Sequence, residues 1–275
     1  MEINAPKDFL NDFDIFNFAA KLQSEICSSQ VEHITIHFPN GNLFKNRIGI
    51  FVQACLVAWG LQKLKKVDFK FDAPSTVWNE NNHKNFFQLC SKNDVITLIS
   101  SRIYNNIPIQ MTDKFEEILV SLMAEVYNNA VEHSEADYII GDCYNNDNGN
   151  DNNKSGMFLF CYDTGIGIIE SVRKFLELSE DENFHTYMAN SKLLNWALKK
   201  GNTTKEPPRG LGMDWLLDFA KINAGYMRIC NENILFEQNT DGVAIYKELD
   251  NKFQGLFFEM HIVEDTDVIY KLKGE

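Results

Sequence analysis

The sequence has no long apolar run, no paired-cysteine motif and no leader-like apolar stretch among its first residues. No apolar stretch approaches the roughly 18 residues of a membrane-spanning helix, so we expect no transmembrane segment. The N-terminal residues include Glu2, Lys7 and Asp8 in place of an apolar core, so we expect no signal peptide. The six cysteines are scattered without a CxxC pair, which is typical of reduced, buried thiols in a cytoplasmic protein.

Positive charge is also scarce, because 26 Lys and Arg face 39 Asp and Glu and leave a net charge of −13. An acidic chain repels phosphate backbones and anionic lipids, so we expect no nucleic-acid or membrane partner. What is abundant is apolar volume: 44% of the 275 residues are hydrophobic and 21 are phenylalanine. This is enough to fill the core of one large or two ordinary domains.

Residues 115–133 predict a helix whose last turns carry a polar stripe. Glu125, Asn129 and His133 recur every four residues, on a line that Leu122 uses for burial one turn earlier. A carboxylate and an amide on a half-buried line need hydrogen bonds, a metal or a hydrated cavity. The pattern therefore fits a ligand site, or else a helix whose end emerges into solvent.

A second motif follows the apolar run 157–162, which predicts a buried strand. The run stops at Asp163, and Gly165 and Gly167 then allow a tight turn and the close approach of a ligand. A carboxylate at a buried strand end suits the recognition of a base amino group. An ordinary strand-ending turn would give the same letters.

The third motif is the segment 201–213, which precedes an apolar helix predicted at 214–223. Backbone amides at a glycine-rich helix start bind anions, and basic or hydroxyl side chains can add to such a site. A flexible solvated loop is the alternative. The candidate phosphate-binding residues are Thr203, Thr204, Lys205, Arg209, Gly210 and Gly212.

The three motifs, in this order, resemble the GHKL nucleotide-binding family, which contains gyrase, heat-shock chaperone, histidine kinase and mismatch-repair ATPases. The resemblance covers roughly residues 110–265, and NAVEHS at 129–134 is closest to standalone members related to histidine kinases and anti-sigma-factor kinases. It implies an α+β fold, namely a two-layer α/β sandwich with a mixed sheet of the Bergerat type, and ATP and Mg²⁺ as ligands.

The resemblance also implies a role for each matching residue. Asn129 would hold Mg²⁺, and Glu125, one turn earlier, would be the general base that activates water. Asp163 would accept a hydrogen bond from the adenine amino group, while Gly165 and Gly167 would shape the adenine end of the pocket. The residues of the third motif would wrap the phosphates.

One position departs from the family pattern. Many relatives carry a Gly-Thr pair on a late strand, where the threonine supports the adenine-binding aspartate. The corresponding pair here is Gly255-Leu256, so the hydroxyl is missing. The departure affects the contact to adenine and leaves the expected fold unchanged.

The resemblance and the hydrophobic periodicity together divide the chain into two domains. Residues 1–105 are expected to form a smaller α/β partner or sensor domain, and residues 106–275 the ATP-binding domain, with a lid at about 170–212. In the first domain the pattern predicts helices at 7–28, 45–65 and 83–92 and strands at 33–38, 67–72 and 94–100.

In the second domain, a strand at 137–144 is expected to pair with 157–162 as an antiparallel hairpin. The segment 170–199 is expected to be helical. Three closing strands are expected at 226–230, 242–249 and 255–263.

The use of ATP is open at this point. The first hypothesis is a slow ATPase that acts as a nucleotide-driven conformational switch. The alternatives are a protein serine kinase of the anti-sigma-factor type and a regulatory subunit that binds nucleotide without chemistry. A protein partner would bind the N-terminal domain, and ATP-dependent homodimerisation is a further expectation that the resemblance carries.

Overall fold

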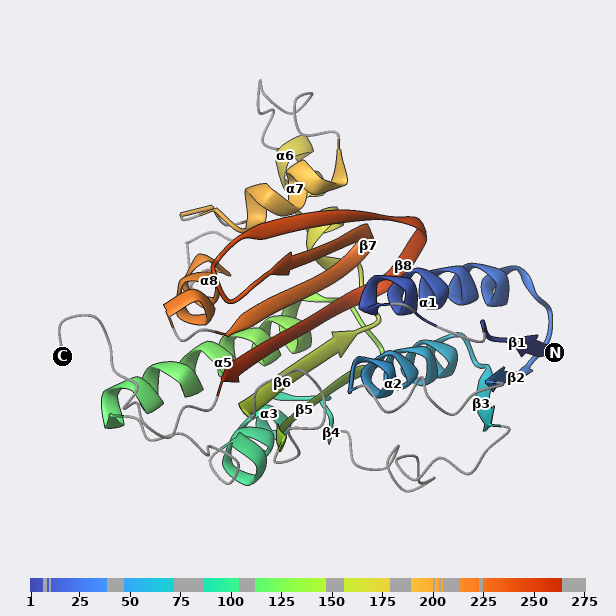
Figure 1. Ribbon diagram of the computed structural model, residues 1–275, viewed down its shortest axis with the longest axis horizontal. Coiled ribbons are helices and arrows are strands. Elements are labelled where there is room, and N and C mark those ends of the chain that lie inside the picture. The colour runs from blue at the N-terminus through green and yellow to red at the C-terminus, as the bar shows by residue number, and fades with distance from the viewer. Residues whose placement is uncertain are drawn as a thin grey trace.

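The computed structural model has a mixed α+β fold with two sheets (Figure 1). The structure describes residues 1–6, 9, 11–38, 47–71, 87–103, 112–146, 156–178, 189–199, 201–202, 204, 213–222 and 225–263. Among these residues, three strands form a parallel sheet in the order β1-β2-β3, and five form a second sheet in the order β4-β5-β6-β8-β7.

The parallel sheet contains β1 (Glu2–Asn4), β2 (His33–Phe38) and β3 (Lys66–Phe71). The helices α1 (Asp12–Ser28) and α2 (Arg47–Gln62) connect its strands. The predicted strands 33–38 and 67–72 and the predicted helix 45–65 are confirmed to within three residues at each end. Helix α1 starts later than predicted because the Asn11 side chain caps it, accepting a hydrogen bond from the backbone N–H of Asp14.

The second sheet contains strands from both halves of the chain. It is antiparallel throughout its described strands, whereas a mixed sheet was expected. The cause is that β5–β6 and β7–β8 are hairpins, and β8 returns antiparallel to β6. The strands are β4 (Phe87–Gln88), β5 (Ile139–Asn146), β6 (Gly156–Asp163), β7 (Tyr226–Gln238) and β8 (Ala244–Val263).

Helices from the part of the chain after residue 112 cover one face of this sheet and share one hydrophobic core with it (Figure 1). They are α5 (Asp113–His133), α6 (Gly167–Leu178), α7 (Asn190–Ala197) and α8 (Met213–Ile222). The helices predicted at 115–133 and 214–223 are thereby confirmed. Residues 179–188 of the predicted helical stretch and of the lid lie outside the described residues.

The opposite face of the sheet packs on α1 and α2. The Phe16 ring meets Phe257 edge to face, with centroids 4.9 Å apart, and Phe51 stacks on Phe160 at 4.3 Å. The N-terminal half therefore shares a core with the C-terminal sheet. Strand β6 is buried at every position because it is covered on both faces, which explains its continuous apolar sequence. The domain boundary after residue 105 stays a prediction.

The prediction of a strand at 94–100 is wrong. Residues Lys92–Leu98 form helix α3, which continues into the π-helical turn η3 (Ile99–Ile103). Ser91 starts the helix: its hydroxyl accepts from the Asp94 N–H at 3.4 Å and donates to the Asp94 carboxylate at 2.9 Å. The helix predicted at 83–92 is also wrong at its end, because 87–88 form β4 and pair with β5. Residues 83–86 lie outside the described residues.

The three closing strands are two in the structure. Strand β7 extends eight residues beyond the predicted 226–230, and the predicted strands 242–249 and 255–263 are parts of one 20-residue strand, β8. The pairing register shifts around Glu232, which has a φ of 55°, and Gly255 has a φ of 90°. This bulge lets one long strand bend without ending.

Candidate functional site

The polar stripe of α5 is formed as predicted from its helical spacing. The Asn129 side chain donates a hydrogen bond from Nδ2 to Glu125 Oε1 at 3.1 Å, so the amide and the carboxylate lie on one face, one turn apart. Both side chains are half-buried. The neighbouring face of α5 is buried in the core, which fixes the rotation of the stripe about the helix axis. The His133 side chain lies outside the described residues.

Asp163 ends β6 as a buried carboxylic acid, with 2% of its surface exposed. Burial raises the pKa of Asp163 to about 7, and a hydrogen bond from the Gly165 N–H to Oδ1, at 2.9 Å, opposes part of that rise. Among the described residues, this N–H is the one hydrogen-bond donor to the carboxyl group. A ligand that brings a second donor would therefore stabilise the ionised form.

The turn after Asp163 packs directly on the C-terminal end of α5. The Ile166 N–H donates to the Ser134 carbonyl at 2.9 Å, and the Ser134 hydroxyl donates to the Ala130 carbonyl inside the helix. A Cβ added to Gly165 would lie 1.8 Å from the Ser134 carbonyl oxygen. The glycine is thus required by close packing, and the contact places the C-terminal end of α5 beside the turn that follows Asp163.

Gly165→Ala is expected to destabilise the fold by about 2–5 kcal/mol, because the methyl group has no space against the Ser134 backbone. Urea unfolding measures the loss. Gly201→Ala is the matched control: nothing lies within 4 Å of its added Cβ, and only its φ of 81° costs stability, roughly 1 kcal/mol. Equal losses for the two variants would contradict the packing argument.

Gly167 is required for two reasons, and the second exposes a residue that sequence reasoning missed. Its φ is 74°, and an added Cβ would lie 2.0 Å from Nδ2 of Asn231. Asn231 is 1% exposed, and its side chain joins α6 to β8. The signal in the sequence was Asn231 itself, a polar residue that directly follows the apolar residues Ile229 and Cys230 in a predicted strand.

The register of the sheet places the pair Gly255-Leu256 beside Asp163. Leu256 pairs with Asp163 across β6 and β8, and a Cβ on Gly255 would lie 2.1 Å from the Asp163 carbonyl oxygen. Leu256 is partly buried against the core. A side chain without a hydroxyl therefore occupies the position opposite the buried carboxyl group, which agrees with the single donor found there.

The third motif is described only at its edges. Helix α8 begins at Met213, directly after Gly212, and Thr204 is exposed. The other predicted phosphate-binding residues lie outside the described residues; they are Thr203, Lys205, Arg209, Gly210 and Gly212. Their meeting with Asn129 and Asp163 stays a prediction.

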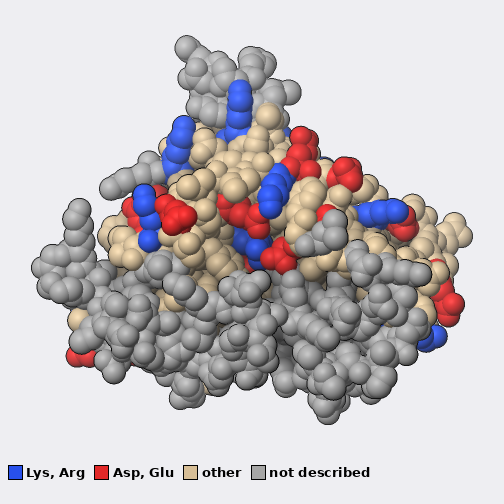
Figure 2. All heavy atoms as spheres, in the orientation of Figure 1, with Lys and Arg blue, Asp and Glu red and all other residues tan. Residues whose placement is uncertain are grey.

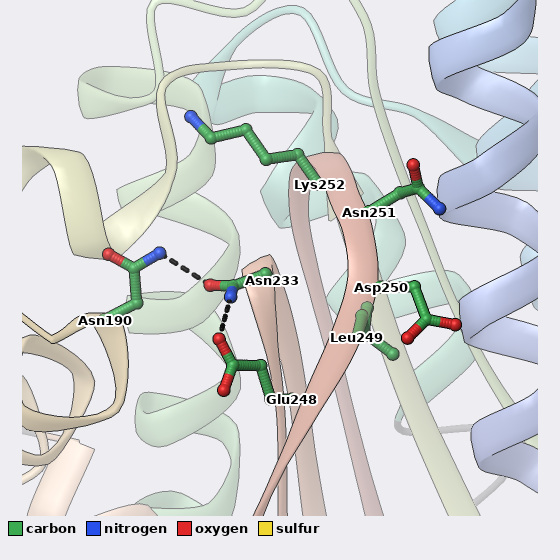
Figure 3. Close-up of a pocket in the computed structure, with 7 residues that line it drawn as sticks. All are labelled: Asn190, Asn233, Glu248, Leu249, Asp250, Asn251 and Lys252. Atoms are coloured by element: carbon green, nitrogen blue, oxygen red, sulfur yellow. Dashed lines mark hydrogen bonds between the residues drawn. The ribbon is translucent and has the colours of Figure 1, made fainter.

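A separate open groove of about 570 Å³ lies at the bulged part of β7 and β8 (Figure 3). The Asn190 amide donates to Asn233, and Asn233 donates to Glu248, so these side chains satisfy one another across α7, β7 and β8. Asp250 is held by Asn17 of α1. None of the predicted site residues that the structure describes lines this groove.

The comparisons with known proteins identify no family, because no family model and no curated protein matches the chain.

In the part of the chain that the structure describes, no helix is long and apolar enough to cross a membrane. Within the same residues no three His, Cys, Asp or Glu side chains are grouped to hold a metal. Figure 2 shows Lys and Arg intermingled with Asp and Glu over the described part of one face.

Proposed function

We propose that the protein binds ATP and Mg²⁺ and hydrolyses the nucleotide slowly, as a nucleotide-driven conformational switch on a Bergerat-type fold. The observation that supports the proposal is the contact between Ser134 and the turn 164–167, because it brings the C-terminal end of α5, the helix that carries Glu125 and Asn129, beside the end of β6 at Asp163. In this proposal a purine nucleotide and its metal ion would extend from Asp163 to Asn129.

Asp163 supplies the base recognition in this proposal. Its carboxyl group is buried, raised in pKa and short of donors, and the adenine 6-amino group is a donor of the required kind. The Gly165 N–H already fixes one carboxylate oxygen. The ionised acid then holds the amino group in a water-poor site, where a charge-assisted hydrogen bond is stronger.

Asn129 supplies the metal contact. The side-chain nitrogen of Asn129 donates a hydrogen bond to the Glu125 carboxylate. The side-chain oxygen of Asn129 therefore points away from that carboxylate. Mg²⁺ prefers oxygen ligands and is commonly held by one or two protein groups together with substrate phosphates and water. A single amide oxygen beside a triphosphate therefore fits Mg²⁺, and a protein-only cage is not needed. The bound ion would neutralise charge on the phosphates.

Glu125 would position and deprotonate the attacking water. Glu125→Gln is expected to lower phosphate release by about 100-fold, the loss typical of a general base, while ATP affinity changes less than about threefold. The glutamine oxygen can still accept the hydrogen bond from Asn129, so the metal contact is kept. Phosphate release and calorimetric affinity are measured on the same preparation.

Glu117→Gln is the control for this variant, because Glu117 lies exposed on the same helix and its loss of charge should change neither quantity. Unchanged phosphate release in Glu125→Gln would show that Glu125 is not the base.

A protein serine kinase of the anti-sigma-factor type is the second candidate, favoured by the NAVEHS sequence at the end of α5. Incubation with γ-labelled ATP separates the candidates. Label on a co-purifying protein, lost in Asn129→Ala, selects the kinase, and label released only as phosphate selects the ATPase. Tight binding without turnover selects a regulatory subunit, with its partner on the N-terminal half.

A further inference from the structure

Asn231 lies at the bulge of β7, and both ends of its buried amide are used. Oδ1 accepts from the Ile169 N–H at 2.9 Å, and Nδ2 donates to the Gly255 carbonyl at 2.8 Å. The first bond reaches α6 and the second reaches β8, so one side chain joins three elements. Only 1% of the surface of Asn231 is exposed, so solvent does not reach its side chain.

The bond to Ile169 completes the start of α6. The first four N–H groups of a helix have no partner within the helix, and they are usually capped by the residue that precedes it. Ile169 is the third residue of α6, directly after the glycine turn. Asn231 thus caps α6 from a strand 62 positions away in sequence, and it fixes the turn to the sheet.

These contacts form a closed ring that includes Asp163, the residue proposed to recognise the base. The chain runs from Asp163 to Gly167, an added Cβ at Gly167 would lie 2.0 Å from Asn231, and Asn231 bonds to Gly255. The ring closes where an added Cβ at Gly255 would lie 2.1 Å from the Asp163 carbonyl oxygen. The shift in register around Glu232 turns the strand at this point.

We propose that Asn231 is a positioning residue for base recognition: it sets the distance between the glycine turn and the Asp163 carboxyl group without touching the nucleotide. This inference rests on the proposed ATP site. It predicts that Asn231 determines selectivity for the 6-amino group of the base, because a shift of the turn relative to the carboxylate changes that hydrogen bond and leaves the phosphates in place.

The test compares ATP with inosine triphosphate, which lacks the amino group, by calorimetry with Mg²⁺. Wild type should prefer ATP by about 100-fold, since a buried acceptor left without its donor rejects the analogue. In Asn231→Ala the preference should fall to about threefold, with affinity for inosine triphosphate unchanged. In steady state, KM for ATP should rise while kcat is retained.

Asn233→Ala is the matched control. It removes a similar hydrogen-bonded amide from the same strand, but its partners are Asn190 and Glu248 at the groove. It should keep the full preference for ATP, whatever it costs in stability. A preference that survives in Asn231→Ala, or that falls equally in both variants, overturns the positioning role.

Amide exchange separates this inference from the proposed function. In Asn231→Ala the Ile169 amide should exchange at least tenfold faster, and the pairing of β6 with β8 should stay protected. If wild type binds no ATP, the proposed function is wrong, but faster exchange at Ile169 would still establish that Asn231 orders the turn. Unchanged exchange at Ile169 would overturn the inference even if ATP binds.

Discussion

Asn129→Ala is expected to weaken Mg²⁺-dependent ATP binding by about 100-fold and to abolish turnover. Removal of the amide takes away the proposed protein ligand of Mg²⁺ and the hydrogen bond that Asn129 donates to Glu125. Loss of a supporting partner alone commonly costs 10–100-fold in metal affinity, so loss of the ligand should cost at least as much. In the variant, affinity with Mg²⁺ should equal the affinity measured in the presence of a chelator.

The control for this prediction is the adjacent asparagine. Asn128→Ala removes the same chemical group one position earlier, and the amide oxygen of Asn128 is buried without a hydrogen-bond partner in the described structure. It should retain the Mg²⁺ dependence and turnover. Loss of the Mg²⁺ effect in Asn128→Ala, with retention in Asn129→Ala, would show that the metal ligand is wrongly assigned.

ATP affinity is expected to rise about tenfold between pH 6 and pH 8, because the ionised Asp163 accepts a charge-assisted hydrogen bond from the adenine amino group, which is stronger than the bond that the neutral acid accepts. With a pKa of about 7, roughly one tenth of the free protein is ionised at pH 6 and nine tenths at pH 8. Asp163→Asn should bind more weakly at pH 8 and lose this dependence. Titration of the phosphates is common to both proteins, so the difference between them isolates Asp163.

The same carboxyl group makes stability depend on pH in the opposite direction. Its pKa is higher in the folded protein than the ordinary 3.8 of the unfolded chain, so folding takes up a proton between these values. Its contribution to the free energy of unfolding is full below about pH 4 and is lost as pH rises through about 7. The loss is on the order of 4 kcal/mol at 1.36 kcal/mol per pKa unit.

Urea unfolding from pH 5 to pH 8 measures this effect. The stability of Asp163→Asn relative to wild type should increase with pH across that range, because the amide carries no charge to desolvate. A constant difference in the free energy of unfolding between the two proteins would show that folding does not raise the pKa of Asp163.

The sequence predicted the parts of the site that depend on local periodicity. Four-residue spacing placed Glu125 and Asn129 on one face of α5, and the apolar run before Asp163 became β6. Both results follow from the geometry of a helix and of a strand covered on two faces. A tight turn at Gly165 and Gly167 was also predicted from the sequence. The sequence did not predict that these glycines pack closely on Ser134 and Asn231, because those are tertiary contacts.

What the sequence did not predict depends on residues far apart in the chain. Asn231 makes its two hydrogen bonds at a bulge, and Phe51 meets Phe160 only because α2 packs on a sheet formed mainly by strands that come after residue 138. The error at α3 has a local cause. Val95 and Leu98 are buried and Ile96 is 63% exposed, which is a helical spacing within a segment rich in strand-forming residues. The Ser91 cap was the overlooked signal.

The central claim is that Asn129 and Asp163 serve one nucleotide. Calorimetric titration with ATP and Mg²⁺ at pH 8, on wild type, Asn129→Ala and Asp163→Asn, tests it most directly. We expect one nucleotide per chain for wild type, loss of the Mg²⁺ dependence in the first variant and loss of preference for ATP over inosine triphosphate in the second. No heat of binding to wild type, or wild-type affinity and selectivity in both variants, would contradict the claim.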